Sequence, residues 1–455
     1  GKTKTITHRI AYLIEKGIPP EHLLAVTFTN KAADEMKKRI AELCSRNQYG
    51  WNGEKTVLHS IFIGTFHSFC VRILRAHAPK IGFTKTFTIF DEDDSLSLMK
   101  EVMKEKNINP KQFAAGMLKH TVSGLKNELV TVEQYETETG GDFFPKIVHT
   151  AYAHYQKKMR ESNAMDFDDL LVHANMLFER YPQTLSALQN YFQYINIDEY
   201  QDVNTAQYRL MRSLAEKHRN IAVIGDDAQA IYSFRGADMR NILNFEKDWP
   251  DARIFTLDQN YRSTQIILDA ARGVIEKNPQ QKQKLLWTEH EGGERIPVWV
   301  CEDEREEAEH IAQKIDTYIT NGRTPRDFAV LYRTNAQSRA IEEAFIQRGF
   351  PYTIIGGTRF YQRKEVKDIL GYIRYVLNPR DFISLKRIIN VPPRGIGSRS
   401  FLAYASAENR GWRERLTQKM IRPLEQFEGR IEDMRARIRE QKTADFIKYT
   451  LTALQ

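Results

Sequence analysis

The sequence has few cysteines and no long apolar run. Cys44, Cys70 and Cys301 are far apart and lack the close spacing that zinc and redox sites use. We interpret them as buried or idle thiols of a reducing compartment. No apolar run approaches the roughly 18 residues that cross a bilayer, and no basic-then-apolar leader opens the chain. We therefore expect a cytoplasmic protein with no membrane partner.

The composition also excludes disorder and a single small fold. Hydrophobic residues make up 41% and charged residues 28%, which is ordinary for folded globular protein. At roughly 100 to 200 residues per domain, 455 residues predict three or four units. The net charge of +8 is compatible with a polyanionic partner, but many other basic proteins carry a similar charge.

Short β-rich apolar runs are each followed at once by polar residues, which is typical of buried parallel strands. The runs are LLAVTF before Thr29 and Asn30, IFIG before Thr65, YINI before Asp198, IAVIG before Asp226, and ARIFTL before Asp258. In open α/β sheets, ligands bind at the carboxyl ends of the strands. We expect these five loops to converge on one site.

The remaining patterns predict the domain organisation. Long charged helices, such as DEDDSLSLMKEVMKEK, indicate a helical insertion, and a second alternation begins with PVWV, FAVLY and YTII around helices at Glu304–Tyr318 and Ala336–Arg348. The predicted units are a first α/β domain (1–78 and 191–257), its helical insertion (79–190), the first part of a second α/β domain (258–380), and the truncated start of a second helical insertion (381–455).

The chain opens with Gly1, Lys2 and Thr3 ahead of a helical pattern. This tripeptide fits the end of a phosphate-binding loop, in which Lys reaches the terminal phosphates and Thr binds Mg²⁺. By itself it also fits a chance helix start. Because the first residue is not Met, we treat the chain as a fragment whose natural start is lost.

Adjacent carboxylates follow the strand-like run YINI. Asp198 is placed to hold Mg²⁺, and Glu199 is placed to orient an attacking water. The alternative is a solvated acidic loop or a charge cluster at a helix N-terminus, but neither explains why a buried strand leads directly into acids.

The segment from Gly225 to Gly236 combines two chemistries. Gln229, near a strand end, can contact a γ-phosphate, whereas Tyr232 and Phe234, next to Arg235, can stack bases and grip a phosphate backbone. The alternative is that both aromatic residues belong to the core. Their polar and glycine neighbours argue against it.

Tyr261 and Arg262 follow a predicted strand at the boundary of the second domain. Tyr261 could stack on adenine, and Arg262 could neutralise charge on a transferring phosphoryl group. Alone, the segment would pass for an ordinary solvated turn.

Taken together, the motifs resemble superfamily 1A helicases, the UvrD, PcrA and Rep group. The matching segments, in family order and approximate spacing, are TFTNKAADEM, GTFHSFC, DFDDLL, NIDEYQDVN, GDDAQAIYSFRGAD, LDQNYRS and VPPRGIG. The resemblance implies an α/β fold of two RecA-like P-loop motor domains with parallel sheets, each carrying a helical insertion. It also implies an ATP-dependent DNA helicase and single-stranded DNA translocase that moves 3′ to 5′ in DNA repair, recombination or replication.

The resemblance also assigns roles to single residues. It implies that Gly1, Lys2 and Thr3 bind ATP and Mg²⁺, Asp198 holds the metal, Glu199 activates water, Gln229 senses the γ-phosphate, Arg262 is an arginine finger, and Tyr261 stacks on adenine. Residues implied for the DNA path are Phe28, His67, Tyr232, Phe234, Arg235, Arg359 and Phe360. Many relatives carry Trp at the position of Phe234. The segment from Pro393 to Gly397 resembles a duplex-gripping hairpin, with a simple turn as the alternative.

Two alternatives to a stand-alone helicase remain: the helicase half of an AddAB- or RecBCD-type nuclease, and a DNA-binding protein that has lost turnover. The expected partners are single-stranded DNA and single/double-strand junctions, with accessory repair or replication proteins. The glycines expected before Gly1 and the family's late motifs are absent, so we expect this chain alone to be inactive as an ATPase.

Overall fold

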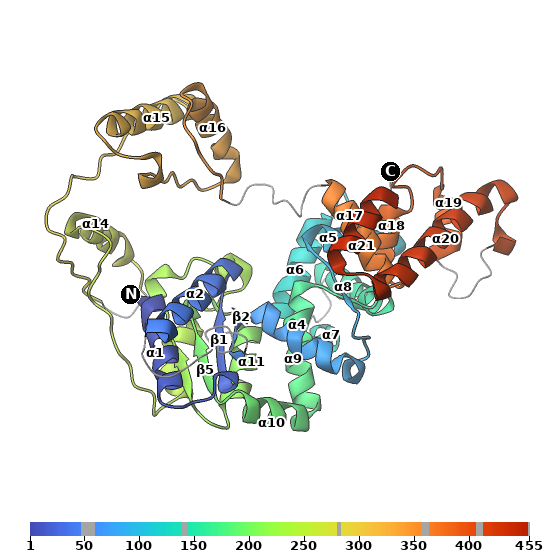
Figure 1. The fold of residues 1–455 in the computed structure, drawn as a ribbon, viewed down its shortest axis with the longest axis horizontal. Coiled ribbons are helices and arrows are strands. Elements are labelled where there is room, and N and C mark those ends of the chain that lie inside the picture. The colour runs from blue at the N-terminus through green and yellow to red at the C-terminus, as the bar shows by residue number, and fades with distance from the viewer. Residues whose placement is uncertain (47–59, 139–142, 280–283, 356–363, 406–412, 454–455) are drawn as a thin grey trace.

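A four-stranded parallel sheet forms the first α/β unit. The computed structural model describes residues 1–46, 60–138, 143–279, 284–355, 364–405 and 413–453 (Figure 1). The strands are β1 (Leu23–Thr27), β2 (Phe62–Thr65), β5 (Tyr194–Ile197) and β6 (Ile221–Val223), in the order β2-β1-β5-β6. All three pairings are parallel, so four of the five predicted strands of this unit are confirmed.

Helices cover both faces of this sheet, as a parallel sheet requires. They are α1 (Lys2–Glu15), α2 (Asn30–Arg46), α4 (Phe66–His77), α9 (Phe167–Arg180), α10 (Pro182–Tyr191) and α11 (Thr205–Ala215). Every residue of β1 is buried. Leu23 and Ala25 join the core with α1 and α2, whereas Leu24 and Val26 join the core with α4, α9 and α11. This alternation produces two hydrophobic layers.

The fifth predicted strand of this unit is not formed. Residues 252–257 are described without any strand pairing, and the Phe255 side chain is 81% exposed. Short helices α12 (Arg240–Leu243) and α13 (Phe245–Asp248) follow β6 instead. An apolar run becomes a strand only where a neighbour offers free backbone groups, and none pairs with this segment among the described residues.

The first helical unit has its own core. Its helices are α5 (Glu92–Glu105), α6 (Ala115–Asn127), α7 (Val132–Glu138) and α8 (Phe143–Glu161), and a short parallel pair, β3 (Thr88–Ile89) with β4 (Ala164–Met165), lies at its base. Leu98, Met99, Val148 and Tyr152 are among its buried residues. Helix α9 packs into the core of the sheet unit, so the separate helical body is shorter than the predicted insertion.

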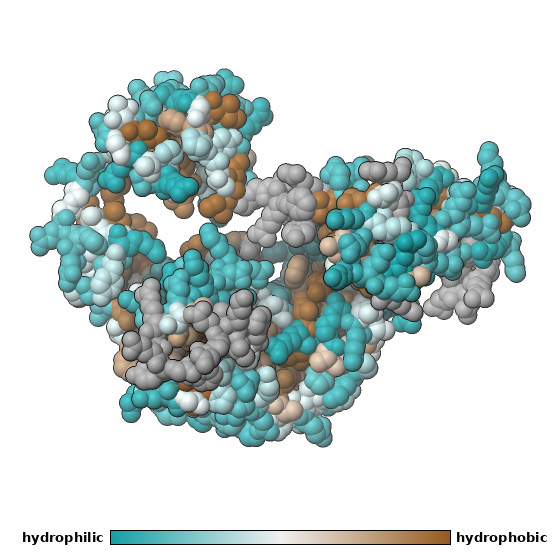
Figure 2. Space-filling view, in the orientation of Figure 1, coloured by the Kyte–Doolittle hydropathy of each residue, from teal (hydrophilic) through white to brown (hydrophobic). Residues whose placement is uncertain are grey.

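The helices expected for the second α/β unit are present. They are α15 (Glu304–Thr320) and α16 (Ser338–Gln347), which pack against each other, and α14 (Gln265–Ile275) precedes them. The predicted strand runs form no sheet in the described part of the chain, and Val300 and Leu331 are almost fully exposed. Brown apolar side chains reach the surface of this unit in Figure 2. Within the described residues, those predicted strands have no neighbouring strands to pair with.

The C-terminal helices form one further core. They are α17 (Lys364–Leu377), α18 (Phe382–Ile388), α19 (Ser398–Ala405), α20 (Gln418–Glu440) and α21 (Thr443–Ala453). Tyr372 of α17 belongs to this core, so the structure places α17 with the second helical unit. This unit lies beside the first one, where Arg374 pairs with Asp94 at 2.7 Å (Figure 1). None of the helices among the described residues is long and apolar enough to span a bilayer.

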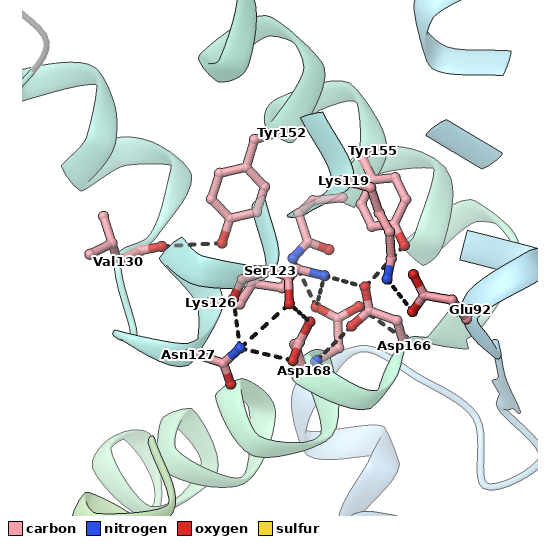
Figure 3. Close-up of polar contacts among 12 residues, drawn as sticks. Glu92, Lys119, Ser123, Lys126, Asn127, Val130, Tyr152, Tyr155, Asp166 and Asp168 are labelled. Carbon is pink, nitrogen blue, oxygen red and sulfur yellow. Dashed lines mark hydrogen bonds and ion pairs between the residues drawn. The ribbon is translucent and has the colours of Figure 1, made fainter. Parts of the chain in front are cut away.

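A buried lysine joins the first helical unit to the sheet unit. Lys126 of α6 has a fully buried side chain, and its Nζ lies 2.6 Å from Asp166 and 2.8 Å from Asp169 at the start of α9 (Figure 3). The Tyr155 hydroxyl from α8 also donates to Asp166. Burial lowers the pKa of Lys126, but the neighbouring carboxylates outweigh it and raise the pKa well above its usual range. The DFDDLL segment therefore has a structural role.

We predict that Lys126→Ala lowers the free energy of unfolding by about 3 to 5 kcal/mol, because it leaves two buried carboxylates without their cation. Urea denaturation followed by circular dichroism measures this change. Lys119→Ala is the matched control on the same helix, since Lys119 pairs with the exposed Glu92, and it should cost at most about 1 kcal/mol. If both variants lowered the free energy of unfolding equally, the buried ion pairs of Lys126 would not have the stabilising role proposed for them.

Candidate functional site

Two hard oxygen donors meet at the carboxyl edge of the sheet. Asp198 follows β5 directly, and its backbone N–H donates to the carbonyl of Val26 on the neighbouring strand β1. Helix α1 begins at this edge, with Gly1 as its N-cap, and Thr3 Oγ1 lies 3.4 Å from Asp198 Oδ2. Burial and the nearby Glu199 raise the pKa of Asp198. A hydroxyl and a carboxylate in this position suit Mg²⁺, which prefers oxygen ligands.

Lys2 brings two further predicted residues together. Its Nζ lies 2.6 Å from Glu199 Oε2 and 3.1 Å from Gln229 Oε1. Glu199 has a left-handed backbone, with φ of 51°. Such a conformation is uncommon outside glycine and often occurs at functional sites. Of the five loops predicted to converge, those after β5 and β6 thus meet, and Lys2 at the start of α1 joins them.

Gln201 links the two loops, although its role was not predicted. Its Nε2 donates to Glu199 Oε2 at 2.9 Å, and its Oε1 accepts from the backbone N–H of Asp226 at 2.9 Å. The packing around this amide is tight, because a Cβ on Gly225 would lie 2.9 Å from Gln201 Oε1. Only a glycine fits there without displacing Gln201.

Lys284 is a second residue that sequence reasoning missed. Its Nζ lies 2.8 Å from Asp226 Oδ1 and also pairs with Asp227. Burial alone would raise the pKa of Asp226, but the hydrogen bond and charge of Lys284 outweigh it and hold the pKa below its ordinary value. No local pattern identifies this lysine, since it lies 58 residues from Asp226 in sequence.

Aromatic side chains gather beside the same loops. The ring of Phe28 lies 5.0 Å from that of Tyr232, and the ring of Tyr232 lies 5.9 Å from that of Phe234. Phe234 is 61% exposed, which argues against a core role. Exposed rings that follow one another are suited to stacking on nucleic-acid bases.

A second aromatic pair lies at the start of α4 and α9. His67 packs edge-on against Phe167 with ring centroids 5.7 Å apart. Burial lowers the pKa of His67 and so favours the neutral ring, which suits stacking better than phosphate binding. Phe167 is 50% exposed and was missed by the sequence reasoning, although it opens the DFDDLL helix.

Two predicted site residues, Tyr261 and Arg262, are not brought to the Lys2 and Glu199 ion pair. Tyr261 is 67% exposed, and its hydroxyl donates to Gln259. Within the described ranges, no hydrogen bond or ion pair joins Tyr261 or Arg262 to Lys2 or Glu199, so their roles stay predictions. Arg359 and Phe360, and the side chain of Arg235, lie outside what the structure describes.

The predicted duplex-gripping segment uses its arginine internally. Arg394 Nη1 donates to the carbonyls of Ile388, Ile389 and Val391, and Nη2 donates to the Tyr372 hydroxyl at 2.6 Å. This guanidinium therefore satisfies carbonyls at the end of α18. A phosphate contact here would fall to the backbone near Gly395, whose φ is 68°.

Comparison with known proteins gives two family matches. The UvrD/REP helicase N-terminal domain matches residues 1–250, and the UvrD-like helicase C-terminal domain matches residues 255–436. The ATP-dependent DNA helicase PcrA of Staphylococcus epidermidis RP62A is 49% identical over 401 residues, which are 88% of this chain and 54% of that protein. PcrA of Staphylococcus aureus Mu50 is 49% identical over 401 residues, which are 88% of this chain and 53% of that protein. The chain thus spans about half the length of these curated relatives.

We predict that Lys284→Ala lowers the free energy of unfolding at pH 7 by about 1 to 2 kcal/mol, between the values for exposed and buried pairs. The folded-state pKa of Asp226 lies below its ordinary value of 3.8. The stabilisation is therefore present above about pH 4 and is lost as the pH falls further. Unfolding of the variant and the unsubstituted chain should be compared from pH 7 to pH 3. Lys277→Ala, which removes an exposed lysine of the same region, is the control. If the difference in free energy of unfolding between Lys284→Ala and the unsubstituted chain were the same at pH 3 as at pH 7, the stabilising pair of Lys284 with Asp226 would be contradicted.

Proposed function

The chain belongs to the UvrD/REP helicase family, and from this we propose that it serves as an ATP-driven motor that moves along single-stranded DNA and unwinds duplexes. One observation carries the proposal: Lys2, Thr3, Asp198, Glu199 and Gln229 meet at the carboxyl edge of one parallel sheet. These are the groups that phosphoryl transfer requires, namely a cation for phosphates, metal ligands, a base and a γ-phosphate contact.

The Lys2 and Glu199 ion pair suggests how nucleotide binding prepares the base. Lys2 would exchange the Glu199 carboxylate for the terminal phosphates of ATP, since both are anions that can pair with its ammonium group. Glu199 would then be released to accept a proton from the attacking water. Thr3 and Asp198 would hold Mg²⁺, whose charge stabilises the transferring phosphoryl group. Gln229 would contact the γ-phosphate.

The aromatic group supports DNA binding by the same loop. The segment that begins at Asp226 and contains Gln229 continues to Tyr232 and Phe234, so one short stretch of chain would contact both nucleotide and bases. In this proposal Arg262 and Tyr261 close onto the nucleotide from the second motor domain, and Arg359 and Phe360 of that domain contribute to the DNA path. Repeated closure and opening would move stacked bases past the rings.

The full-length gene product tests this proposal directly. Phosphate release from ATP is measured with and without single-stranded DNA, and strand displacement is measured on duplexes with a 3′ or a 5′ single-stranded tail. We expect DNA-stimulated hydrolysis and unwinding from the 3′ tail. An ATP hydrolysis rate that does not change when DNA is added would contradict the proposed motor activity. Unwinding of the duplex with the 5′ tail would contradict only the proposed direction of movement.

We predict that Glu199→Gln in the full-length gene product lowers ATP turnover by at least about a hundredfold, the lower range for losing a general base. The amide keeps the shape of the side chain but cannot accept the proton, so binding of a fluorescent ATP analogue should persist. Glu216→Gln, on the sheet unit but outside the site, is the control. Near-normal turnover in Glu199→Gln would remove this residue from its role.

We predict that Phe234→Ala weakens binding to a labelled oligothymidine by about 1 to 3 kcal/mol, the range for one lost stacking contact. Fluorescence anisotropy at constant salt measures the affinity, since salt alone changes it steeply. Tyr12→Ala removes a similarly exposed ring from α1 and should leave the affinity unchanged. If both variants bind oligothymidine with the affinity of the unsubstituted protein, Phe234 does not belong to the DNA path.

A further inference from the structure

We propose that Asn127, the last residue of α6 in the first helical unit, is a positioning residue for the aromatic DNA-binding loop. The aromatic loop is defined as residues 230–236, which contain Tyr232 and Phe234. The inference rests on the proposed function, because it assumes that this loop binds DNA. It adds that the loop takes its position from a side chain of the helical unit, and so from outside the motor sheet.

Both ends of the Asn127 amide are held by hydrogen bonds. Its Nδ2 donates to the Ser123 carbonyl at 2.9 Å and to Asp168 Oδ1 at 3.2 Å, and its Oδ1 accepts from Asn204 Nδ2 at 2.6 Å. Figure 3 shows the amide nitrogen facing Ser123 and Asp168. The residue is only 9% exposed. Rotation of the amide would leave buried polar groups without partners, which is costly.

The backbone of the aromatic loop passes close to Asn127 at Gly236. Gly236 has φ of 81°, and a Cβ added there would lie 3.3 Å from the Cβ of Asn127. Gly236 ends the turn Ser233–Arg235, which carries Phe234, and its N–H donates to the Ser233 carbonyl. A shift of Gly236 would therefore move the Phe234 ring.

Asn127 also fixes the chain segment that faces the end of the loop. Its partner Asn204 caps α11 by accepting from the Gln207 N–H, and Asn204 bridges to Ala237. The next residue, Asp238, donates its N–H to the Val203 carbonyl at 3.1 Å. Asn127 thus lies beside Gly236 and holds Asn204, the residue that pairs with Ala237.

The neighbouring Lys126 keeps this end of α6 in place. Its ion pairs with Asp166 and Asp169 are buried beside Asp168, which also accepts from Ser123 Oγ at 2.6 Å. The end of α6 is consequently attached to α9 by two adjacent polar groups. Asn127 therefore presents a fixed surface to the loop.

The test measures oligothymidine affinity by fluorescence anisotropy for the full chain and its Asn127→Ala variant. We expect the variant to bind at least tenfold more weakly. Tyr155→Phe is the matched control, because it removes a hydroxyl from the same buried cluster without touching the loop, and its affinity should stay within twofold. All measurements are made at a temperature at which circular dichroism shows every variant folded.

A double-mutant cycle separates positioning from general loss of structure. When Phe234 is already alanine, Asn127→Ala should weaken binding less than threefold, because the ring that it positions is gone. The inference would be overturned if Asn127→Ala bound oligothymidine with unchanged affinity, or if it weakened binding equally in the presence and absence of Phe234→Ala. The single variant Phe234→Ala could still support the proposed function in either case. A folded, unsubstituted chain that does not bind oligothymidine would overturn both.

Discussion

The parallel pairing of β1 with β5 is the constraint on which the candidate site depends. It aligns Val26 with Ile197, although the whole of the first helical unit lies between the two strands in the sequence. This register brings Asp198 and Glu199 to the same edge as the start of α1. Because both faces of β1 are covered, a shifted register would move apolar side chains between two filled cores. The position of the acids is therefore set by hydrophobic packing as much as by their own contacts.

The sequence was informative wherever a local pattern and its surroundings agreed. An apolar run followed by acids predicted both the strand β5 and the placement of Asp198 at its end, because the same residues make the strand and lead into the loop. The meeting of Glu199 and Gln229 followed from the general rule on strand ends, whereas the role of Lys2 came from the phosphate-loop pattern and the family resemblance. Helices α15 and α16 were likewise found at the predicted positions, since their amphipathic period is a local property.

The rest depended on partners that a local pattern does not reveal. The runs around Phe255, Val300 and Leu331 have the composition of buried strands, but strand formation also needs a neighbouring backbone. Lys126 looks like any helical surface lysine until α9 supplies its two carboxylates. Lys284 and Gln201 were missed for the same reason. Each becomes recognisable only through residues that are distant in sequence or that lie on another loop.

The buried attachment at Lys126 has a mechanical consequence for the molecule. Separating α6 from α9 would require an ammonium group and two carboxylates to lose their partners together, so bending at this junction is strongly resisted. We expect hinge motion to occur elsewhere in the chain. The first helical unit would then move as one body, from α5 and α8 to Asn127 at the end of α6. A force applied to α5 or α8 would be transmitted through α6 to the turn that carries Phe234.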